Sequence, residues 1–405
     1  MNILFFSPGF PGEMPFFTAA LAEVGARVYG LGDQPAAALP ERARHALAGY
    51  LQVPDLWDEG DLLRRVGELH RQVGLQGIEC LWEPGMVLAA QLREGLGLPG
   101  MTVAQTVPFR DKEVMKTVLD RAGIRTPRHF KATTVRGCRE AAERLGFPLI
   151  LKPIAGAGSA DTYRVDDVGE LEEALPRLQH VAEVSVEEFI DGEEFTFDTI
   201  TAGGEIQYYN IGWYRPRPLV ARTVQWISPQ TVALRDVHRP DLAGGRQMGQ
   251  AVLSALGFES GFTHMEWFLK ADGEAVFGEI GARPPGARSV ETMNYACDID
   301  VFRGWAEAVT GRAMSQPVER RYNSVVIFKR AQGEGRIRRI EGLAGLMSRF
   351  GEHVVSVDLL PVGAPRRNWK QSLLSDGWVM VRHPVLGRAL EIADRFGTDL
   401  QIYAG

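Results

Sequence analysis

The chain has 405 residues, more than one hydrophobic core usually serves, so its length predicts two or three subdomains. A hydrophobic content of 45%, a charged content of 24%, and 45 Gly with 23 Pro are typical of a soluble, loop-rich α/β protein. The formal net charge of -6 at pH 7 argues against nucleic acid as the main partner, because neutralising phosphates needs clustered Lys and Arg.

The cysteine spacing and the hydropathy pattern indicate the expected cellular compartment. Cys80, Cys138 and Cys297 lie far apart with no CxxC spacing, so neither a disulfide framework nor a zinc site is expected, and a reducing cytoplasm fits. The N-terminal apolar run is short and lacks a basic flank, and no stretch approaches a membrane-spanning length. We therefore expect a cytoplasmic protein with no membrane partner, neither exported nor anchored.

The first part of the chain alternates short apolar runs with helical patterns, which is typical of a parallel α/β unit. A Gly- and Pro-rich loop at 7–12 follows the first apolar run. Its glycines do not form GxGxxG, so a ligand contact and a plain tight turn both remain open. The expected elements are strands at 2–6, 27–31 and 80–82 and helices at 14–24 and 86–96.

A lysine beside a Gly-rich loop marks the middle of the chain. Asp111 is expected to cap a helix that begins at Lys112. The buried strand at 147–153 contains Lys152 and leads into the loop 154–160. A lysine at a strand end beside such a loop can hold phosphate through its charge and through backbone N–H groups, although a mobile hairpin turn explains the same glycines.

Two further strands are expected at 184–188 and 193–199. Between them, the apolar Phe189 and Ile190 are candidates to flank an adenine. Glu194, at the start of the second strand, is a candidate acceptor for ribose hydroxyls.

The stretch 261–285 is predicted to be a β-hairpin that turns at Asp272-Gly273, a dipeptide that suits a tight two-residue turn. This turn places Glu266 opposite Glu279, with the two side chains about 5 Å apart on one face of the sheet. Like charges so placed repel unless a proton or a cation lies between them, and hard oxygen ligands suit Mg²⁺. A metal site is one interpretation, and a surface hairpin with solvated glutamates is the other.

Alternation divides this hairpin into a site face and a core face. The glutamate face is expected to carry His264, Phe268, Phe277 and Gly281, and the core face Met265, Trp267, Leu269, Val276 and Ile280.

The remaining segments give weaker patterns. The stretch 213–226 mixes arginines with aromatic residues in an expected loop, which fits either contact with an anionic or aromatic substrate or a solvated surface. The C-terminal part is expected to form antiparallel strands at 324–329, 335–340 and 354–360 and a final helix at 386–396.

The order of four segments is more specific than any one of them. DKEVMKTVLDRAGIRTP, FPLILKPIAGAGS, VEEFIDGEEFTFD and THMEWFLKADGEAVFGEIGARPPG follow one another in this chain. Together they resemble the ATP-grasp superfamily, nearest in pattern to its carboxylate-amine ligases of the L-amino-acid ligase and biotin-carboxylase-like branch. The resemblance implies an α/β (α+β ATP-grasp) fold with a Rossmann-like domain at 1–111, a two-subdomain ATP-grasp clamp at 112–315 and a small antiparallel domain at 316–405.

The resemblance also implies roles for individual residues. Lys112 and Lys152 would contact ATP phosphates, under a loop containing Gly156, Gly158 and Ser159. Glu187, Glu188, Phe189 and Ile190 would line the adenine, with backbone groups of Glu188 and Ile190 reading its edge, and Glu194 would bind ribose. Glu266 and Glu279 would hold one or two Mg²⁺ ions, and Arg283 would stabilise the transferring phosphoryl group.

One position departs from the family pattern. Many ATP-grasp enzymes have an Asn as third metal ligand two residues after the second Glu, and here that position is Gly281. The full protein ligation of a second Mg²⁺ is therefore in doubt, while a water or substrate oxygen can replace the amide.

The implied reaction activates a carboxylate as an acyl phosphate that an amine captures, with ADP and phosphate released. The partners would be two small molecules, with a homodimer left open. Arg288 is a candidate to grip a substrate carboxylate, with a surface ion pair as the alternative, and His264 is either a base toward the amine or a structural histidine. A biotin-carboxylase-type carboxylase and a nucleotide-binding protein without ligase chemistry are the competing interpretations.

Overall fold

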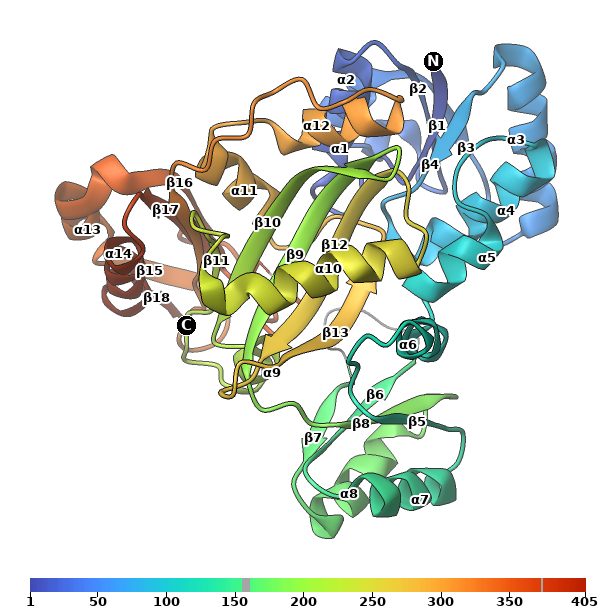
Figure 1. The fold of residues 1–405 in the computed structure, drawn as a ribbon. Coiled ribbons are helices and arrows are strands. Elements are labelled where there is room, and N and C mark those ends of the chain that lie inside the picture. The colour runs from blue at the N-terminus through green and yellow to red at the C-terminus, as the bar shows by residue number, and fades with distance from the viewer. Residues whose placement is uncertain (155–160, 373) are drawn as a thin grey trace.

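The computed structural model describes residues 1–154, 161–372 and 374–405. The chain begins with a parallel four-stranded sheet in the order β3-β2-β1-β4. Figure 1 shows helices around this sheet, drawn in blue and cyan. Its elements are β1 (Asn2–Phe6), α1 (Met14–Glu23), β2 (Arg27–Gly32), α2 (Glu41–Ala46), β3 (Leu47–Gln52), α3 (Glu59–Val73), β4 (Gly77–Glu79), α4 (Met86–Leu96) and α5 (Val103–Thr106), with 3-10 helices η1 (Ala36–Ala38), η2 (Glu83–Gly85) and η3 (Val107–Phe109).

The prediction of a parallel α/β start is confirmed, and one strand was misplaced. The strand expected at 80–82 lies at β4, and the segment after it leaves the sheet. Cys80 and Leu81 are nevertheless buried. Their apolar character reflects packing at the sheet edge rather than strand pairing.

A second, antiparallel sheet forms the separate lobe at the bottom of Figure 1. Its order is β5-β8-β6-β7, and α7 and α8 share its core with residues such as Leu149, Leu151 and Val186. Asp111 accepts hydrogen bonds from the N–H groups of Glu113 and Val114, which confirms it as the N-cap of α6. The elements are α6 (Lys112–Arg121), β5 (His129–Ala132), α7 (Val135–Leu145), β6 (Leu149–Pro153), β7 (Tyr163–Val165), α8 (Val168–Ala174), η4 (Leu175–Leu178) and β8 (Val184–Glu188).

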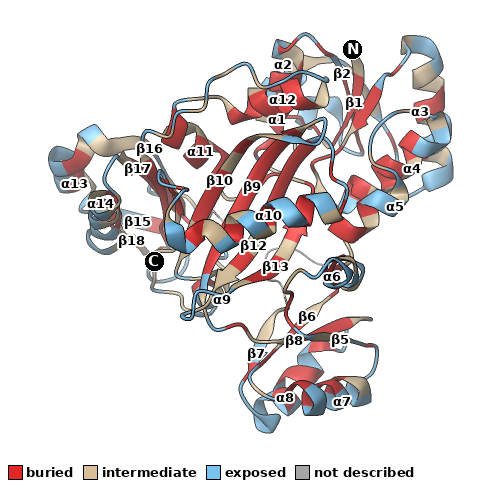
Figure 2. Ribbon diagram, viewed as in Figure 1, coloured by how far each residue is buried: buried red, intermediate tan, exposed pale blue. Residues whose placement is uncertain are grey.

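The largest sheet has eight strands in the order β13-β12-β9-β10-β11-β14-β17-β16. Helix α10 covers one face, and α11 and α12 cover part of the other (Figure 1). The strands between them are largely buried (Figure 2). The elements are β9 (Glu193–Ala202), β10 (Glu205–Arg215), α9 (Pro218–Thr223), β11 (Gln230–Ala233), η5 (Pro240–Leu242), α10 (Ala243–Ala255), β12 (Gly261–Leu269), β13 (Ala275–Gly281), α11 (Ser289–Cys297), α12 (Val301–Val309), β14 (Asn323–Phe328), β15 (Ile337–Glu341), α13 (Leu343–Phe350), η6 (Gly351–His353), β16 (Val354–Leu359), β17 (Gly377–His383), α14 (Leu386–Asp399) and β18 (Gln401–Ala404).

Helix α10 lies close to the sheet because two of its three glycines, Gly245 and Gly249, face aromatic rings of the strands. A Cβ atom at Gly245 would lie 2.2 Å from the Trp267 ring, and one at Gly249 would lie 2.3 Å from the Phe197 ring. Phe195, Phe197 and Trp267 fill this side of the core, which leaves the opposite face of β9 and β12 for polar side chains.

The hairpin β12–β13 pairs Glu266 with Glu279 and His264 with Gly281, as predicted, although the predicted turn was wrong. Lys270 N–H donates to the Glu274 carbonyl at 3.0 Å, so a three-residue loop closes the hairpin. The longer loop shifts the pairing of residues 267–269 by one position from the predicted register. A bulge between Glu266 and Trp267 then brings Glu266 back opposite Glu279.

The bulge also changes the predicted faces. Phe277 pairs with Trp267 and joins the core, whereas Val276 pairs with Phe268 on the glutamate side. Gly278 permits the bulge, because a Cβ there would lie 2.8 Å from the Glu266 carbonyl oxygen.

Two further expectations need correction. Residues 213–215 belong to β10, paired with β11 from Gly212–Ala233 to Arg215–Gln230, and 218–223 are helical, so only part of 213–226 is a loop. The C-terminal strands are antiparallel as predicted, but β14, β17 and β16 extend the central sheet, and only β15 and β18 pair apart from it. The boundaries 1–111, 112–315 and 316–405 stay predictions.

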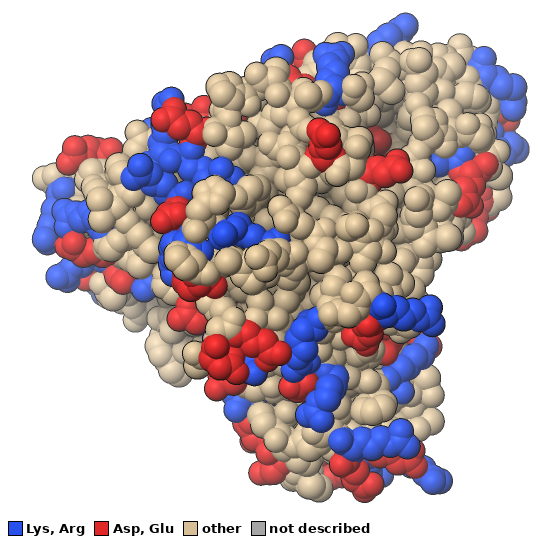
Figure 3. All heavy atoms as spheres, in the orientation of Figure 1, with Lys and Arg blue, Asp and Glu red and all other residues tan. Residues whose placement is uncertain are grey.

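On the face drawn in Figure 3, acidic and basic side chains intermix over the α7–α8 lobe and the C-terminal region. Among the described helices, none combines the length and the apolar composition that a bilayer crossing requires.

Candidate active site

The glutamates of the hairpin meet the start of α6 in space. Lys112 Nζ lies 3.2 Å from Glu279 Oε1, which connects the central sheet to the helix that precedes the smaller sheet. The Glu266 and Glu279 side chains are partly exposed, and we call them the acid pair. Within the described ranges no group of three or more His, Cys, Asp or Glu residues is arranged to hold a metal.

A second charged group, the lysine cluster, consists of Lys116, Lys152 and Glu187. Glu187 binds Lys152 at 2.9 Å and also forms an ion pair with Lys116. Burial opposes the charge of Glu187, but the two ammonium groups outweigh it and hold the pKa of this carboxyl well below its usual range. The Glu187 carboxylate, predicted to line the adenine, is therefore bound to two lysines.

Sequence reasoning missed Lys116 as a site residue. It lies one helical turn after Lys112 in α6, so the i, i+4 spacing places both lysines on one face of the helix. That spacing was the available evidence in the sequence. Burial lowers the pKa of Lys116, while Glu187 opposes this change.

His264 joins the acid pair to a buried aspartate. Its Nδ1 lies 2.6 Å from Asp198 Oδ1, and its Nε2 lies 3.5 Å from Glu266 Oε1. Burial lowers the pKa of His264, but Asp198 outweighs this and raises it to about 9. The imidazole is therefore protonated at neutral pH, which favours a cationic role over the base considered from the sequence.

Glu266 is held as an anion by its neighbours. Burial opposes its charge, but His264, Arg283 and a hydrogen bond from Tyr214 lower its pKa to about 2. The Tyr214 hydroxyl donates to Glu266 Oε1 at 3.1 Å. Both carboxylates of the acid pair thus have positive or donating groups beside them, which offset the repulsion between the two like charges.

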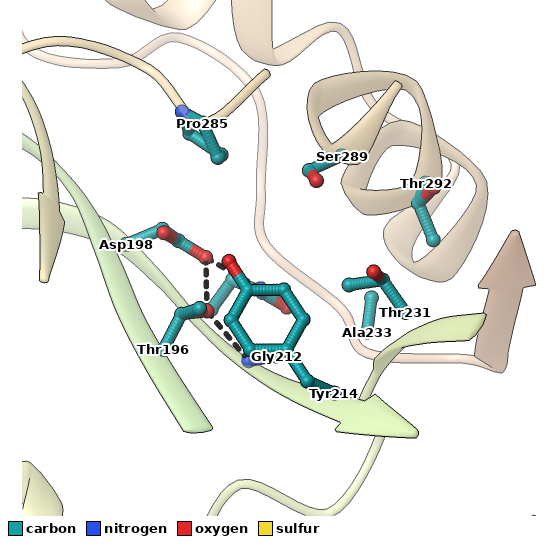
Figure 4. A pocket seen from close by; sticks show the side chains of 10 residues that line it. Thr196, Asp198, Gly212, Tyr214, Thr231, Ala233, Pro285, Ser289 and Thr292 are labelled. Carbon is teal, nitrogen blue, oxygen red and sulfur yellow. Dashed lines mark hydrogen bonds between the residues drawn. The ribbon is translucent and has the colours of Figure 1, made fainter. Parts of the chain in front are cut away.

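A small polar pocket adjoins this network (Figure 4). Thr196 and Asn210 donate to Asp198 at 2.7 and 3.0 Å, which fixes the carboxylate that holds His264. The pocket lies between β9–β11 and α11, and it is lined by Thr196, Asp198, Asn210, Gly212, Tyr214, Thr231, Ala233, Pro285, Ser289 and Thr292.

The two arginines predicted at the site have protein partners. Arg283 Nε donates to Glu83 Oε2 at 2.6 Å, which connects the end of the β12–β13 hairpin to η2 in the N-terminal part of the chain. Arg288 Nη1 donates to Glu291 Oε1 at 2.6 Å, and its guanidinium lies 4.6 Å from the Trp378 ring centroid. Glu291 thus holds Nη1 of Arg288, whereas the buried Nε has no hydrogen-bond partner among the described residues.

The residues predicted around adenine are only partly arranged as expected. The Glu188 backbone N–H donates to the Arg128 carbonyl at 2.9 Å, and the Ile190 carbonyl accepts from Arg217 at 3.1 Å. These two backbone groups are thus engaged within the protein. Glu194 lies beside Arg217, which sequence reasoning had not placed near the nucleotide residues. Gly156, Gly158 and Ser159 lie outside the described residues.

The chain combines an antiparallel sheet that carries a strand-end lysine with a larger sheet that carries paired carboxylates. Comparisons with family models identify the superfamily of the chain. An ATP-grasp N-terminal domain model matches residues 17–100, and an ATP-grasp domain model matches residues 145–291. The chain belongs to the ATP-grasp superfamily.

Several curated relatives are ligases, each matched over part of its length. The chain is 26% identical over 211 residues to an L-arginine-specific L-amino acid ligase of Bacillus subtilis, covering 50% of each chain. It is 38% identical over 108 residues to a D-alanine--D-alanine ligase of Stutzerimonas stutzeri, covering 26% of this chain and 34% of the relative. The chain thus spans about half or less of these relatives.

Solved structures establish the fold along the whole chain. An L-amino acid ligase from Bacillus licheniformis superposes with a TM-score of 0.80 at 22% identity, covering 100% of this chain and 99% of the other. A biotin carboxylase from Campylobacter jejuni gives 0.67 at 15% identity, covering 99% and 91%. The predicted superfamily and fold class are confirmed.

Proposed function

We propose that the protein is an ATP-dependent, ADP-forming ligase that couples a carboxylate to an amine. The observation that carries the proposal is the acid pair of Glu266 and Glu279, in which Glu279 pairs with Lys112, together with the lysine cluster held by α6, β6 and β8. The ligase relatives support the same reaction class.

In the proposed reaction, a substrate carboxylate oxygen attacks the γ-phosphorus of ATP, and the bond to the bridging oxygen of ADP breaks. The resulting acyl phosphate is attacked by an amine, which loses a proton and forms an amide as phosphate leaves. In this proposal Lys112, Lys152 and Arg283 neutralise phosphate charge during the transfer.

The acid pair fits a magnesium ion, because it offers two partly exposed carboxylates from adjacent strands. When bound, Mg²⁺ would supply further neutralisation of the phosphate groups. Gly281, opposite His264, contributes no side-chain oxygen, so a second ion would depend on ligands from substrate or water.

His264 has a defined part in this proposal. As an imidazolium held by Asp198, it presents a positive charge beside Glu266 and keeps that carboxylate oriented. Removal of the amine proton then falls to another group, such as phosphate leaving the acyl phosphate.

The test is an assay of ADP release over paired small carboxylates and amines, with ATP and Mg²⁺ present. We expect release that requires both a carboxylate and an amine, and we expect mass spectrometry to detect their amide. Release that instead requires bicarbonate and biotin would indicate a carboxylase, and nucleotide binding without release over the panel would indicate a protein without ligase chemistry. The proposed cytoplasmic setting and a homodimer are separate questions for fractionation and sedimentation.

A further inference from the structure

Three cations gather near one half-buried tryptophan, Trp369, and we call Arg222, Arg330 and Lys370 the cation cluster. The guanidinium carbon of Arg330 lies 4.5 Å from the Trp369 ring centroid, and Lys370 Nζ lies 5.6 Å from it. Arg222, in α9, donates from Nη1 to the Lys370 carbonyl at 3.2 Å. Helix α9, the segment after β14 and the loop between β16 and β17 thus bring these side chains together.

The cation cluster is held by backbone oxygens rather than by carboxylates. Arg330 Nη1 donates to the Val224 carbonyl at 2.8 Å, and among the described residues none of the three cations forms an ion pair. The carboxylate whose charge favours the Arg330 cation is that of Asp376. Asp376 already accepts hydrogen bonds from the backbone N–H groups of Ala331 and Arg367, at 2.8 and 2.7 Å. The protein therefore sets three positive charges against one nearby carboxylate.

This arrangement disfavours the charges that it contains. Arg222 and Arg330 are both half-buried. Burial and repulsion by Arg222 lower the pKa of Arg330 to about 10, although Asp376 opposes the change. Burial also lowers the pKa of Arg222. Like charges held together away from water destabilise a fold, and an anion between them removes that cost.

A comparable arginine in the same sheet does have a carboxylate partner. The guanidinium carbon of Arg215, at the end of β10, lies 5.2 Å from the Trp213 ring centroid. Its Nη1 lies 3.2 Å from Asp394 Oδ1 and donates to Gln230 at 2.8 Å. Contact with a tryptophan ring is therefore combined with an acidic partner at Arg215 and lacks one at Arg330, which makes Arg215 a matched control.

The cation cluster lies apart from the acid pair. Strands β9, β10 and β11 separate β12 from β14, so at about 4.8 Å per strand the strand leading to Arg330 runs roughly 19 Å from the one that carries Glu266. Arg330 follows Phe328 by two residues, and Phe328 pairs with Trp378, the residue under Arg288. By alternation, Arg330 is expected on the sheet face that carries Arg288, at a distance from the phosphate chemistry.

We propose that the cation cluster binds a dianionic oxyacid group, the chemical class of phosphate monoesters and dicarboxylates. Three cations beside one carboxylate leave a charge that a dianion neutralises, and guanidinium groups bind such oxygens through parallel N–H bonds. Two sources bring the same chemistry, the far end of a substrate of the proposed ligase and a separate effector. Binding of the group itself does not depend on the proposed ligase reaction.

The experiment measures binding of inorganic phosphate, succinate and acetate to the full chain by calorimetry, with ADP and Mg²⁺ present. We expect the wild type to bind phosphate or succinate more tightly than acetate. Arg330→Gln and Arg222→Gln should each weaken binding of the dianion about tenfold, whereas Arg215→Gln should bind it as the wild type does. Without added anions, Arg330→Gln should unfold at the same temperature as the wild type or higher, because a repelling charge is gone, and Arg215→Gln should unfold at a lower temperature.

Other results would overturn the inference. Equal affinities for the three anions would do so, as would the absence of binding or dianion binding that persists unchanged in both Arg330→Gln and Arg222→Gln. If Arg330→Gln does not fold, Arg222→Gln decides by the same ratio of affinities. In the ligase assay, succinate that raises the KM of one substrate and leaves kcat unchanged would assign the group to that substrate, and succinate that changes kcat would assign it to an effector. Failure of the ligase assay would leave the binding result standing.

Discussion

The lysine cluster and the acid pair both contain ion pairs, but they differ in how far these ion pairs are exposed. In the lysine cluster, the side chains of Lys116 and Glu187 are only 1% and 4% exposed, so their charges compensate one another inside the protein. In the acid pair, Glu279 and Glu266 are 28% and 32% exposed, and each contacts a cationic side chain at its edge. The comparison indicates that the first group is part of the structural core as well as the site, whereas the second is available to a ligand.

The largest expected effect tests the acid pair. Glu279→Gln removes one carboxylate from the proposed metal site, so we expect turnover with Mg·ATP to fall by orders of magnitude. Glu279 is 28% exposed although Lys112 is only 6% exposed, so the free energy of unfolding should fall by less than the about 3–5 kcal/mol typical of breaking a fully buried pair. Steady-state kinetics and urea unfolding measure the two quantities. A variant that kept turnover but lost stability would mark Glu279 as scaffold.

In the lysine cluster, we expect removal of the carboxylate to lower the free energy of unfolding. Glu187→Gln leaves two buried ammonium groups without their shared carboxylate, and breaking such a pair costs about 3–5 kcal/mol. We expect a loss of this order in urea unfolding of the protein without nucleotide. Glu188→Gln is the control on the next residue, because Glu188 pairs with the more exposed Arg125 and Arg128. Equal stability losses in the two variants would contradict the comparison.

The extent to which the sequence predicts these groups depends on the range of the interactions. The Glu266–Glu279 pairing follows from local hairpin periodicity, yet the correct register came from two offsetting errors, a longer loop and a bulge at Gly278. Neither error was visible in the pattern, because Asp272-Gly273 fits both a two-residue and a three-residue loop.

Contacts between distant segments were harder to predict. The pairing of Lys116 with Glu187, 71 residues away, depends on how α6 packs against β8. The position of Arg217 depends on strand β10 continuing to Arg215. The arginines and prolines of residues 213–226 are instead typical of a loop. Periodicity does not encode such packing, and the family resemblance supplied only residues that match its motifs.

The pH dependence of stability tests the cation that supports the acid pair. The pKa of His264 is raised to about 9, above the value of about 6.5 expected in the unfolded chain. Its stabilisation is therefore complete below pH of about 6.5 and is lost as the pH rises through about 9, a change of order 3 kcal/mol. Urea unfolding at both ends of this window should show a larger loss in the wild type than in Asp198→Asn. Glu194 titrates in the same window and is present in both proteins. Parallel pH profiles would contradict the Asp198–His264 assignment.

The smallest expected effect concerns Arg288, whose partners lie outside both groups. Its Nη1 is bound by Glu291 and its guanidinium lies over Trp378, so a substrate carboxylate would meet a cation that Glu291 already partly neutralises. We expect Arg288→Ala to raise the KM of the carboxylate substrate a few-fold, with the KM of ATP little changed.

Arg283→Ala should instead lower kcat, because Arg283 lies within reach of the charges around the acid pair and is held there by Glu83. Burial opposes the charge of Arg283, but Glu83 raises the pKa of this guanidinium, so it remains a cation throughout the pH range of the assay. If Arg288→Ala lowered kcat and Arg283→Ala changed only the substrate KM, the two arginines would have to exchange roles, and substrate binding would lie closer to the acid pair than Arg288 does.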